Sequence, residues 1–331
     1  MLVEARRYSP PTIDGLGDPP LRDRVRGLLG RVRRRVLRRD RAPAVPPPHS
    51  RLPAHLLGER ATLEVVSHEH SRALYLGQET VLCRVLGKYL VYADAQETGI
   101  TPHLALDGYW ESWITSALAR TVRPGWHCLD VGANHGYYTL VLADGAGPDG
   151  RVAPVEPTPR LAGLLRETLD VNGFPYVDVL QKAAWDTDGE MLHLVVPAHR
   201  SLNAHLVDEV GPGDEAVVVE SVTIDSVTRD WPRVDLIKID VEGAEERVWR
   251  GMQETIARNS DLIVVLELNV DRYDDPRGFL RTIESAGFAL RYVDVDAAVK
   301  DVSVDRLLSE QVGDDWMLYL ARGRRPYTGV P

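Results

Sequence analysis

Acidic and amide side chains follow four short apolar runs of this 331-residue chain, a pattern that could support ligand binding or proton transfer. The residues concerned are Asp130, Asn134, Glu156, Asp240, Glu242 and Glu267. Apolar runs of this length are typical of buried strands, and ligands of open α/β sheets lie beyond the carboxyl ends of the strands. We therefore expect these side chains to share one crevice, as hydrogen-bond acceptors, general bases or ligands of a divalent cation.

The first apolar run, residues 126–131, continues into a glycine-containing turn and then into apolar residues at helical spacing over 138–143. Gly132 and Gly136 can adopt backbone angles closed to other residues, and we expect them to let a ligand approach the main chain. A strand, a glycine turn and a helix form the nucleotide crevice of doubly wound α/β folds. The spacing here is Gly-x-x-x-Gly, however, and not the Gly-x-Gly-x-x-Gly of dinucleotide-binding proteins.

Glu156 stands 20 residues after Gly136, at the end of the second predicted strand. A carboxylate at this point can accept hydrogen bonds from both ribose hydroxyls of an adenosine. A dinucleotide would also need closely spaced glycines and a free helix N-terminus for its pyrophosphate. Asp130 beneath the turn and Asn134 within it suit a ligand with a positive sulfonium or ammonium group. S-adenosylmethionine has an adenosine without phosphates, a sulfonium and an amino-acid tail, so it is the expected cofactor.

Strands and helices alternate along the rest of the chain, which predicts parallel strands joined by crossover helices. The expected strands are 126–131, 151–156, 177–181, 234–239, 262–268, 288–293 and 316–321, with an antiparallel insertion formed by 192–197 and 217–222. The expected crossover helices are 161–171, 244–256 and 278–286. A helix starting near Tyr109 should lie beside the cofactor mouth, which makes Tyr109 and Glu111 binding candidates. The predicted fold class is α/β, a Rossmann-like, doubly wound and mainly parallel seven-stranded sheet.

Four stretches of the chain together resemble the FkbM family of S-adenosylmethionine-dependent methyltransferases. They are 129–139 (Leu-Asp-Val-Gly-Ala-Asn-His-Gly-Tyr-Tyr-Thr), 155–159 (Val-Glu-Pro-Thr-Pro), 222–226 (Val-Thr-Ile-Asp-Ser) and 235–245 (Asp-Leu-Ile-Lys-Ile-Asp-Val-Glu-Gly-Ala-Glu). The last stretch is the most specific, and the similarity covers roughly residues 105–322. His135 departs from the small or apolar residue expected at its position. The resemblance implies a class I methyltransferase fold and does not explain residues 1–100, so an additional N-terminal accessory region is expected.

The resemblance also implies roles for residues by their position. Together with Tyr109 and Glu111, the residues expected to hold S-adenosylmethionine are Asp130, Gly132, Asn134, Tyr138, Thr139, Glu156, Pro157, Ala183 and Asp240. Glu156 would hold the ribose, and Pro157 and Ala183 would lie beside the adenine. Asp240 would lie next to the reacting methyl group. The catalytic candidates are Asp240, Glu242, Glu267 and, as an outside candidate, His135.

The expected reaction is O-methylation of a small-molecule hydroxyl, on a sugar or a polyketide-type product of secondary metabolism, by in-line transfer. Because the cofactor is already activated, the protein aligns the reactants and a carboxylate removes the hydroxyl proton. A carboxylate acceptor, giving a methyl ester, would instead prefer cationic neighbours such as Lys238 or Arg272. A nicotinamide-dependent oxidoreductase and an inactive binding scaffold are the remaining alternatives. Mg²⁺ bound by the three carboxylates is a less favoured alternative, and no residue is assigned as a metal ligand.

The sequence divides into four expected parts. Residues 1–50 form a basic, proline-rich arm with twelve arginines against five acidic residues and an amphipathic helix over 21–41. Residues 51–108 are expected to be a small β-rich accessory region, with strands at 62–66 and 82–92. Residues 109–322 are the expected methyltransferase domain, and 323–331 a C-terminal tail.

Composition narrows the classes of partner. The net charge of −10 argues against nucleic acid. Two cysteines cannot build a disulfide framework, and no apolar run reaches the roughly 18–20 residues of a membrane span. Without an N-terminal signal pattern, a cytoplasmic location is expected. The basic helix could pack on its own domain or on a second copy, which leaves a homodimer through the N-terminal region open, or it could bind an anionic surface.

Overall fold

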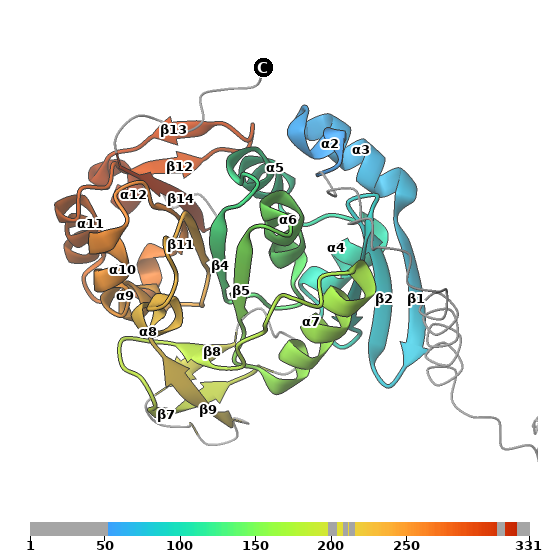
Figure 1. Cartoon of the computed structure of the whole chain (residues 1–331), viewed down its shortest axis with the longest axis horizontal. Coiled ribbons are helices and arrows are strands. Elements are labelled where there is room, and N and C mark those ends of the chain that lie inside the picture. The colour runs from blue at the N-terminus through green and yellow to red at the C-terminus, as the bar shows by residue number, and fades with distance from the viewer. Residues whose placement is uncertain (1–51, 198–203, 208–210, 212–215, 310–314, 323–331) are drawn as a thin grey trace, which may run out of the picture. The chain divides into compact units, whose positions relative to one another are not determined.

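The computed structural model describes residues 52–197, 204–207, 211, 216–309 and 315–322. Its main element is a seven-stranded sheet with strand order β13-β12-β14-β11-β10-β4-β5 (Figure 1). The strands are β4 (His127–Val131), β5 (Arg151–Val155), β10 (Leu236–Ile239), β11 (Ile263–Leu268), β12 (Arg291–Val293), β13 (Val299–Asp301) and β14 (Trp316–Ala321). The basic arm, its expected helix and the C-terminal tail lie outside the described residues.

Five strands of this sheet, β12, β11, β10, β4 and β5, run in one direction, and β14 and β13 run in the opposite direction. β11, β10, β4 and β5 run parallel, whereas β14 pairs antiparallel with β11 and β12, and β13 with β12. The seven-stranded count is confirmed, but the expected strand over 177–181 is wrong. Within that stretch only Leu180 forms an isolated bridge, with Val155, and the seventh strand is β13 at the opposite edge.

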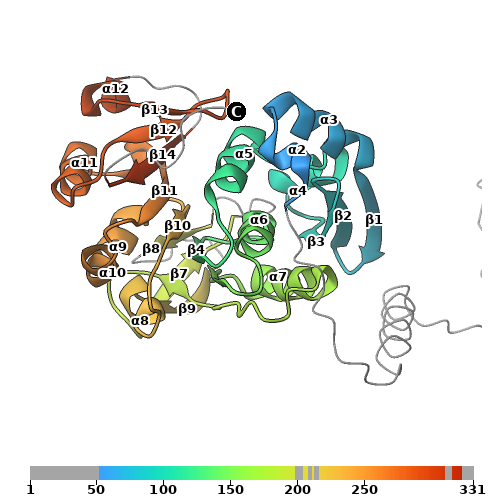
Figure 2. The ribbon, with the colours of Figure 1, turned by 45° about the horizontal axis from the view of Figure 1, so that its top comes forward.

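Helices cover both faces of the sheet because successive strand residues point to opposite sides (Figures 1 and 2). Cys128, Leu236 and Val265 pack in one core with α5 (Ser112–Thr121) and α6 (Tyr137–Ala146). Their alternating neighbours, such as Leu129 and Ile237, pack in a second core with α9 (Glu245–Arg250), α10 (Gln253–Arg258) and α11 (Pro276–Ser285). Because helices bury the strand residues on both faces of the sheet, the strand sequences are continuously apolar.

The remaining helices of this domain are short or lie near the edge of the sheet. They are α7 (Pro159–Asn172), α8 (Ile224–Thr228), the 3₁₀ turn η2 (Val270–Arg272) and α12 (Val304–Ser309). The single helix expected over 244–256 is divided into α9 and α10 at Gly251. A Cβ atom at Gly251 would stand 2.1 Å from the carbonyl oxygen of Trp185, so the close approach of the two segments requires glycine.

The accessory region is more helical than its sequence suggests. It comprises α2 (Ala54–Leu57), α3 (Arg60–His70), a sheet of β1 (Arg72–Gly77), β2 (Thr80–Val85) and β3 (Tyr89–Asp94), and α4 (Ile100–Leu106). The expected strand at 62–66 is wrong, because these residues lie inside α3. The expected strand at 82–92 is an antiparallel hairpin, in which Val85 pairs with Tyr89. In α3, burial of Leu63 against the core outweighs the β propensity of its neighbours.

The expected insertion forms a separate small sheet of β6 (Ala183–Ala184), β9 (Ala216–Val222), β7 (Met191–Val195) and β8 (His205–Val207). β7 pairs antiparallel with both β8 and β9, as the sequence predicts. Leu194 and Val219 pack on Ala183, so this sheet has its own apolar cluster. In the described part of the chain, no helix combines the length and apolar character needed to cross a membrane.

Candidate active site

A cavity of about 750 Å³ lies where the sequence places the ligand, at the carboxyl ends of the parallel strands. Its wall on the cofactor side contains Gly132, Asn134, Val155, Glu156, Pro157, Thr158, Ala183 and Ala184. The opposite part is lined by Asp240, Glu242, Glu267, Asn269, Arg272 and Asp315. The accessory region and the start of α5 contribute Arg60, Glu64, His103, Asp107, Tyr109, Trp110, Glu111 and Trp113. The accessory region therefore completes the site.

The turn after β4 has no free amide for a phosphate. The five N–H groups of residues 132–136 all donate to partners inside the protein. Their partners are the carbonyls of Val155 and Ala133, the side chain of Asn134 and Oε2 of Glu156, at 2.8 to 3.0 Å. Because a pyrophosphate needs unpaired N–H groups here, the turn fits an adenosine ligand that carries no phosphates.

The two glycines of the turn are required by packing inside the protein. Both have positive φ, and a Cβ at Gly132 would lie 1.8 Å from the carbonyl oxygen of Asp240. A Cβ at Gly136 would lie 2.1 Å from the side chain of Leu165. The expectation that both glycines admit a ligand is therefore corrected. The loop after β10 packs closely on Gly132, and α7 packs closely on Gly136. Gly132 also lines the cavity.

Glu156 ties the turn to the start of α7. Its Oε2 accepts the N–H of Asn134 at 2.9 Å, and its Oε1 accepts the N–H of Thr158 at 2.8 Å. Burial raises the pKa of this carboxyl, while the two backbone hydrogen bonds oppose the shift. The small residues Ala183 and Ala184 leave room beside it for a flat base. This donor and acceptor set fits the adenosine part of S-adenosylmethionine.

Three residues expected to touch the cofactor lie behind the cavity wall. Asp130, Tyr138 and Thr139 are buried and are not among the lining residues. Thr139 donates to Oδ2 of Asp130 at 2.5 Å, and Tyr138 places its ring 4.8 Å from the Nζ atom of Lys238. Burial raises the pKa of Asp130 against the opposing effect of Lys238. These residues support the turn from below.

His135 is also absent from the cavity, which corrects its expected catalytic role. Its side chain is fully buried, and Nε2 accepts the backbone N–H of Asp94 at 3.0 Å. This bond leaves the ring proton on Nδ1, which has no partner among the described residues. Burial lowers the pKa of His135 to about 4, so the ring is neutral at ordinary pH. The residue joins the end of β3 to the cofactor turn.

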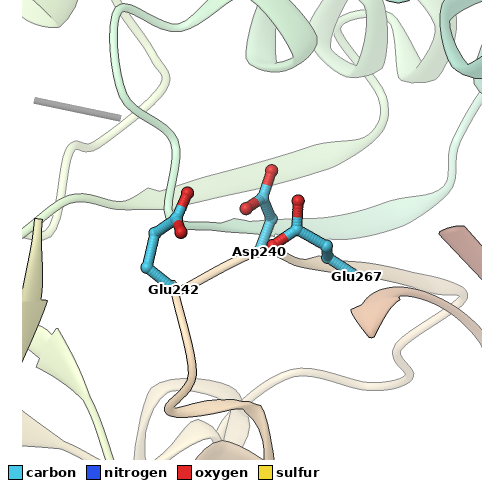
Figure 3. A group of neighbouring side chains, drawn as sticks. All are labelled: Asp240, Glu242 and Glu267. Carbon is cyan, nitrogen blue, oxygen red and sulfur yellow. The ribbon is translucent and has the colours of Figure 1, made fainter. Parts of the chain in front are cut away.

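The three remaining catalytic candidates do converge. Asp240, Glu242 and Glu267 point their carboxylates into one space, and one oxygen of each lies within 4.8 Å of the others (Figure 3). Three oxygens at this spacing could hold a divalent cation. Arg272 competes for that role, because its guanidinium nitrogens lie 2.8 Å from Glu242 and 2.9 Å from Glu267.

Crowding of like charges shapes this group. Burial and the neighbouring Asp240 raise the pKa of Glu242 to about 8, and the same two causes raise the pKa of Glu267. Asp240 is held by an ion pair with Lys238 at 2.9 Å. Arg272 also reaches Asp315 at 3.4 Å. The group is thus a proton-rich hydrogen-bonding surface with one shared cation.

Glu245 sets the shape of the loop that carries Asp240 and Glu242. Its Oε1 accepts the N–H groups of Val241 and Gly243, and its Oε2 accepts the hydroxyl of Tyr273 at 2.6 Å. Glu242 has a left-handed φ of 57°. A non-glycine residue keeps this conformation only when its surroundings hold it, and the Glu245 contacts do so.

Four residues line the cavity without having been predicted: Asp315, Trp110 and the accessory residues Arg60 and Glu64. Asp315 lies 48 residues after Glu267 and enters the cavity because β14 pairs with β11. Glu64 accepts hydrogen bonds from Arg60 at 2.6 Å and Ser112 at 2.5 Å. The spacing of these residues resembles no ligand motif, so the sequence offers no signal for them.

A doubly wound sheet, a phosphate-free adenosine site and carboxylates at the carboxyl ends of β10 and β11 together define a methyltransferase of class I type. Residues 130–290 match the family model described as the methyltransferase FkbM domain. The match spans just under half of the chain and marks residues 130–290 as an FkbM-type methyltransferase domain, for which S-adenosylmethionine is the cofactor.

Curated relatives match only short parts of the chain. A protein-L-isoaspartate O-methyltransferase of Methanopyrus kandleri is 46% identical over 59 residues, which are 18% of this chain and 26% of the relative. Another, of Aeropyrum pernix, is 36% identical over 105 residues, covering 29% of this chain and 39% of the relative. The chain thus spans well under half of these relatives, and their acceptor is not transferred to it.

Solved structures with a related outline share little sequence. The methyltransferase FkbM of Methylobacillus flagellatus KT has a TM-score of 0.37 and 15% identity, over 63% of this chain and 54% of that one. A putative rRNA methylase of Clostridium thermocellum has a TM-score of 0.40 and 10% identity, over 62% of this chain and 93% of that one. Neither identifies a substrate.

Proposed function

We propose that this protein transfers the methyl group of S-adenosylmethionine to a hydroxyl of a small molecule, such as a sugar or a polyketide-type product. One observation carries the proposal: a single cavity has an adenosine-type wall at Glu156 and an acidic cluster at Asp240, Glu242 and Glu267. When bound, the cofactor supplies an activated methyl group. The family match over residues 130–290 supports this reading.

The protein's own residues would align the acceptor and manage its proton. Protonated Glu242 and Glu267 can donate hydrogen bonds to an acceptor oxygen, and Asp240 can accept one. The aromatic side chains of Tyr109, Trp110 and Trp113 line the cavity and can pack on the apolar faces of the acceptor. The cavity would align the acceptor oxygen with the methyl carbon.

Methyl-ester formation on a carboxylate acceptor is less well supported. Such an acceptor would need a cation free to bind it, and Arg272 already contacts Glu242, Glu267 and Asp315. A hydroxyl acceptor needs no such cation.

Calorimetric titration of the full chain with S-adenosylmethionine, S-adenosylhomocysteine and NAD tests the proposal. We expect the first two to bind and NAD not to bind. Transfer of a tritium-labelled methyl group to a panel of methyl glycosides, polyketide alcohols and simple carboxylic acids then tests the acceptor class. Binding of NAD alone, or labelling of the acids alone, would overturn the proposal.

A further inference from the structure

Glu111 differs from the other carboxylates of the cavity in its contacts. Its Oε2 accepts the hydroxyl of Tyr138 at 2.6 Å, and its Oε1 has no partner among the described residues. The other cavity carboxylates are held by cations, a histidine or backbone N–H groups. Glu64 pairs with Arg60, Asp107 with His103 and Asp240 with Lys238. Arg272 pairs with Glu242, Glu267 and Asp315, and Glu156 accepts two backbone N–H groups. Among these carboxylates Glu111 alone has no cation, histidine or backbone N–H as a hydrogen-bond partner in the described part of the chain, and its Oε1 is available.

The backbone holds Glu111 in an unusual position. It immediately precedes α5 with φ 35° and ψ 64°, a left-handed conformation that is rare for glutamate. Such conformations cluster at functional sites, where the surrounding structure maintains them. Here the carbonyl of Glu111 accepts the N–H of Thr115, and the Tyr138 bond holds the carboxyl end. Both ends of the residue are therefore fixed, and its side chain lines the cavity.

We propose that Glu111 is the general base of the reaction, and that it does not hold the cofactor. This proposal rests on the methyltransferase function proposed above. In the step, the acceptor hydroxyl gives its proton to Oε1 of Glu111. The acceptor oxygen bonds to the methyl carbon as the carbon–sulfur bond breaks, and that bond's electron pair stays on the sulfur, which becomes a neutral thioether. Glu111 then returns the proton to solvent, so charge and atoms balance.

The charges around Glu111 suit this task. Burial raises the pKa of its carboxyl to about 7, with Asp240 and Asp315 adding to the rise and the Tyr138 hydrogen bond and Lys238 opposing it. A base whose pKa is near the working pH combines an ionised fraction with a strong affinity for the proton. Glu242, with a pKa of about 8, and Glu267 hold their protons more tightly and are less available as acceptors.

The first test separates a base from a cofactor ligand. S-adenosylhomocysteine is titrated calorimetrically into the full-length wild type and Glu111→Gln, whose amide oxygen can still accept the Tyr138 hydroxyl. We expect affinities within about threefold of each other. With the best acceptor from the panel above, kcat should fall about 100-fold or more. A tenfold or greater loss of affinity would overturn the proposal, whereas failure of the wild type to bind would overturn the methyltransferase function itself.

The second test measures the titration of the Glu111 carboxyl directly and needs no methyl acceptor. Protein labelled with ¹³C at the glutamate carboxyl carbon is titrated by NMR, and Glu111→Gln assigns the signal. We expect a midpoint near 7 that rises in Tyr138→Phe, because the carboxylate loses a hydrogen bond. Tyr137→Phe, which removes a neighbouring buried hydroxyl bonded to Thr115, is the matched control and should leave the midpoint in place. A Glu111 midpoint below 5, or equal shifts in both variants, would contradict the assignment.

Discussion

The Nζ atom of Lys238 lies 2.9 Å from Oδ2 of Asp240, and the lysine side chain is 1% exposed while the aspartate is 24% exposed. Lys238 also stands opposite Asp130 in the pairing of β10 with β4. Burial lowers the pKa of Lys238, but Asp240 and Asp130 outweigh it, so the pKa lies above its usual value. One buried cation thus supports both the cofactor turn and the acidic cluster.

Replacing Lys238 by Met should destabilise the protein by about 3–5 kcal/mol, because Asp130 would remain buried without its compensating charge. Urea unfolding measures the change. Lys182→Met is the matched control, because it removes a lysine from an exposed pair with Glu220 and should cost less than about 1 kcal/mol. Similar losses in both variants would show that the buried position of Lys238 is not what matters.

Glu156→Ala should weaken S-adenosylhomocysteine binding by about tenfold or more, measured by calorimetry. The change removes an acceptor for the ribose and releases the N–H groups of Asn134 and Thr158. Glu246→Ala, on α9 in a surface pair with Arg250, should bind like the wild type. Unchanged affinity in Glu156→Ala would argue against the adenosine wall described here.

Glu267→Ala should reduce kcat by more than it reduces cofactor affinity, because Glu267 lies in the acidic cluster, near the carboxyl end of β11, and away from Glu156. Steady-state kinetics with the best acceptor, together with calorimetry, separates the two effects. We expect a loss of at least about tenfold in kcat with affinity within about threefold. If Glu267→Ala and Glu156→Ala lost cofactor affinity equally, the division between the two walls would be wrong.

His135 should make stability depend on pH. Its folded pKa of about 4 lies below the ordinary value of 6.5, so between these values the unfolded chain binds more protons. The contribution of His135 to the free energy of unfolding is therefore fully present above about pH 6.5 and is lost as the pH falls toward 4. Between pH 7 and pH 5 the loss should be about 2 kcal/mol.

Urea unfolding at pH 5, 6 and 7 measures the slope of the unfolding free energy against pH in the wild type and in His135→Ala. The variant should be less stable at pH 7 and should lack the His135 part of the slope. His70→Ala, which changes an exposed histidine of α3, is the control and should retain it. An unchanged slope in His135→Ala would show that His135 is not the group whose titration sets the pH dependence.

Local pattern predicted much of the domain correctly, and its errors have physical causes. The run at 126–131 and the apolar run at 262–268 read as strands because both faces of the sheet are covered, and they are β4 and β11. Residues 177–181 (Val-Asp-Val-Leu-Gln) also contain apolar residues and follow a crossover helix, but backbone pairing with β5 is limited to Leu180. Whether a run joins a sheet depends on a partner edge, which a local pattern does not contain.

The sequence alone determined which carboxylates gather at the carboxyl edge of the sheet, because parallel strands must bring Glu156, Asp240 and Glu267 to one edge. Tertiary structure decided which of these side chains face the cavity and which support it. His135 turned inward to meet Asp94, and Asp130 turned toward Lys238, since buried polar groups must find partners wherever the fold supplies them. Asp315 reached the cavity through the pairing of β14 with β11, a contact between distant segments that no spacing in the sequence records, whereas Glu111 was already expected beside the cofactor mouth.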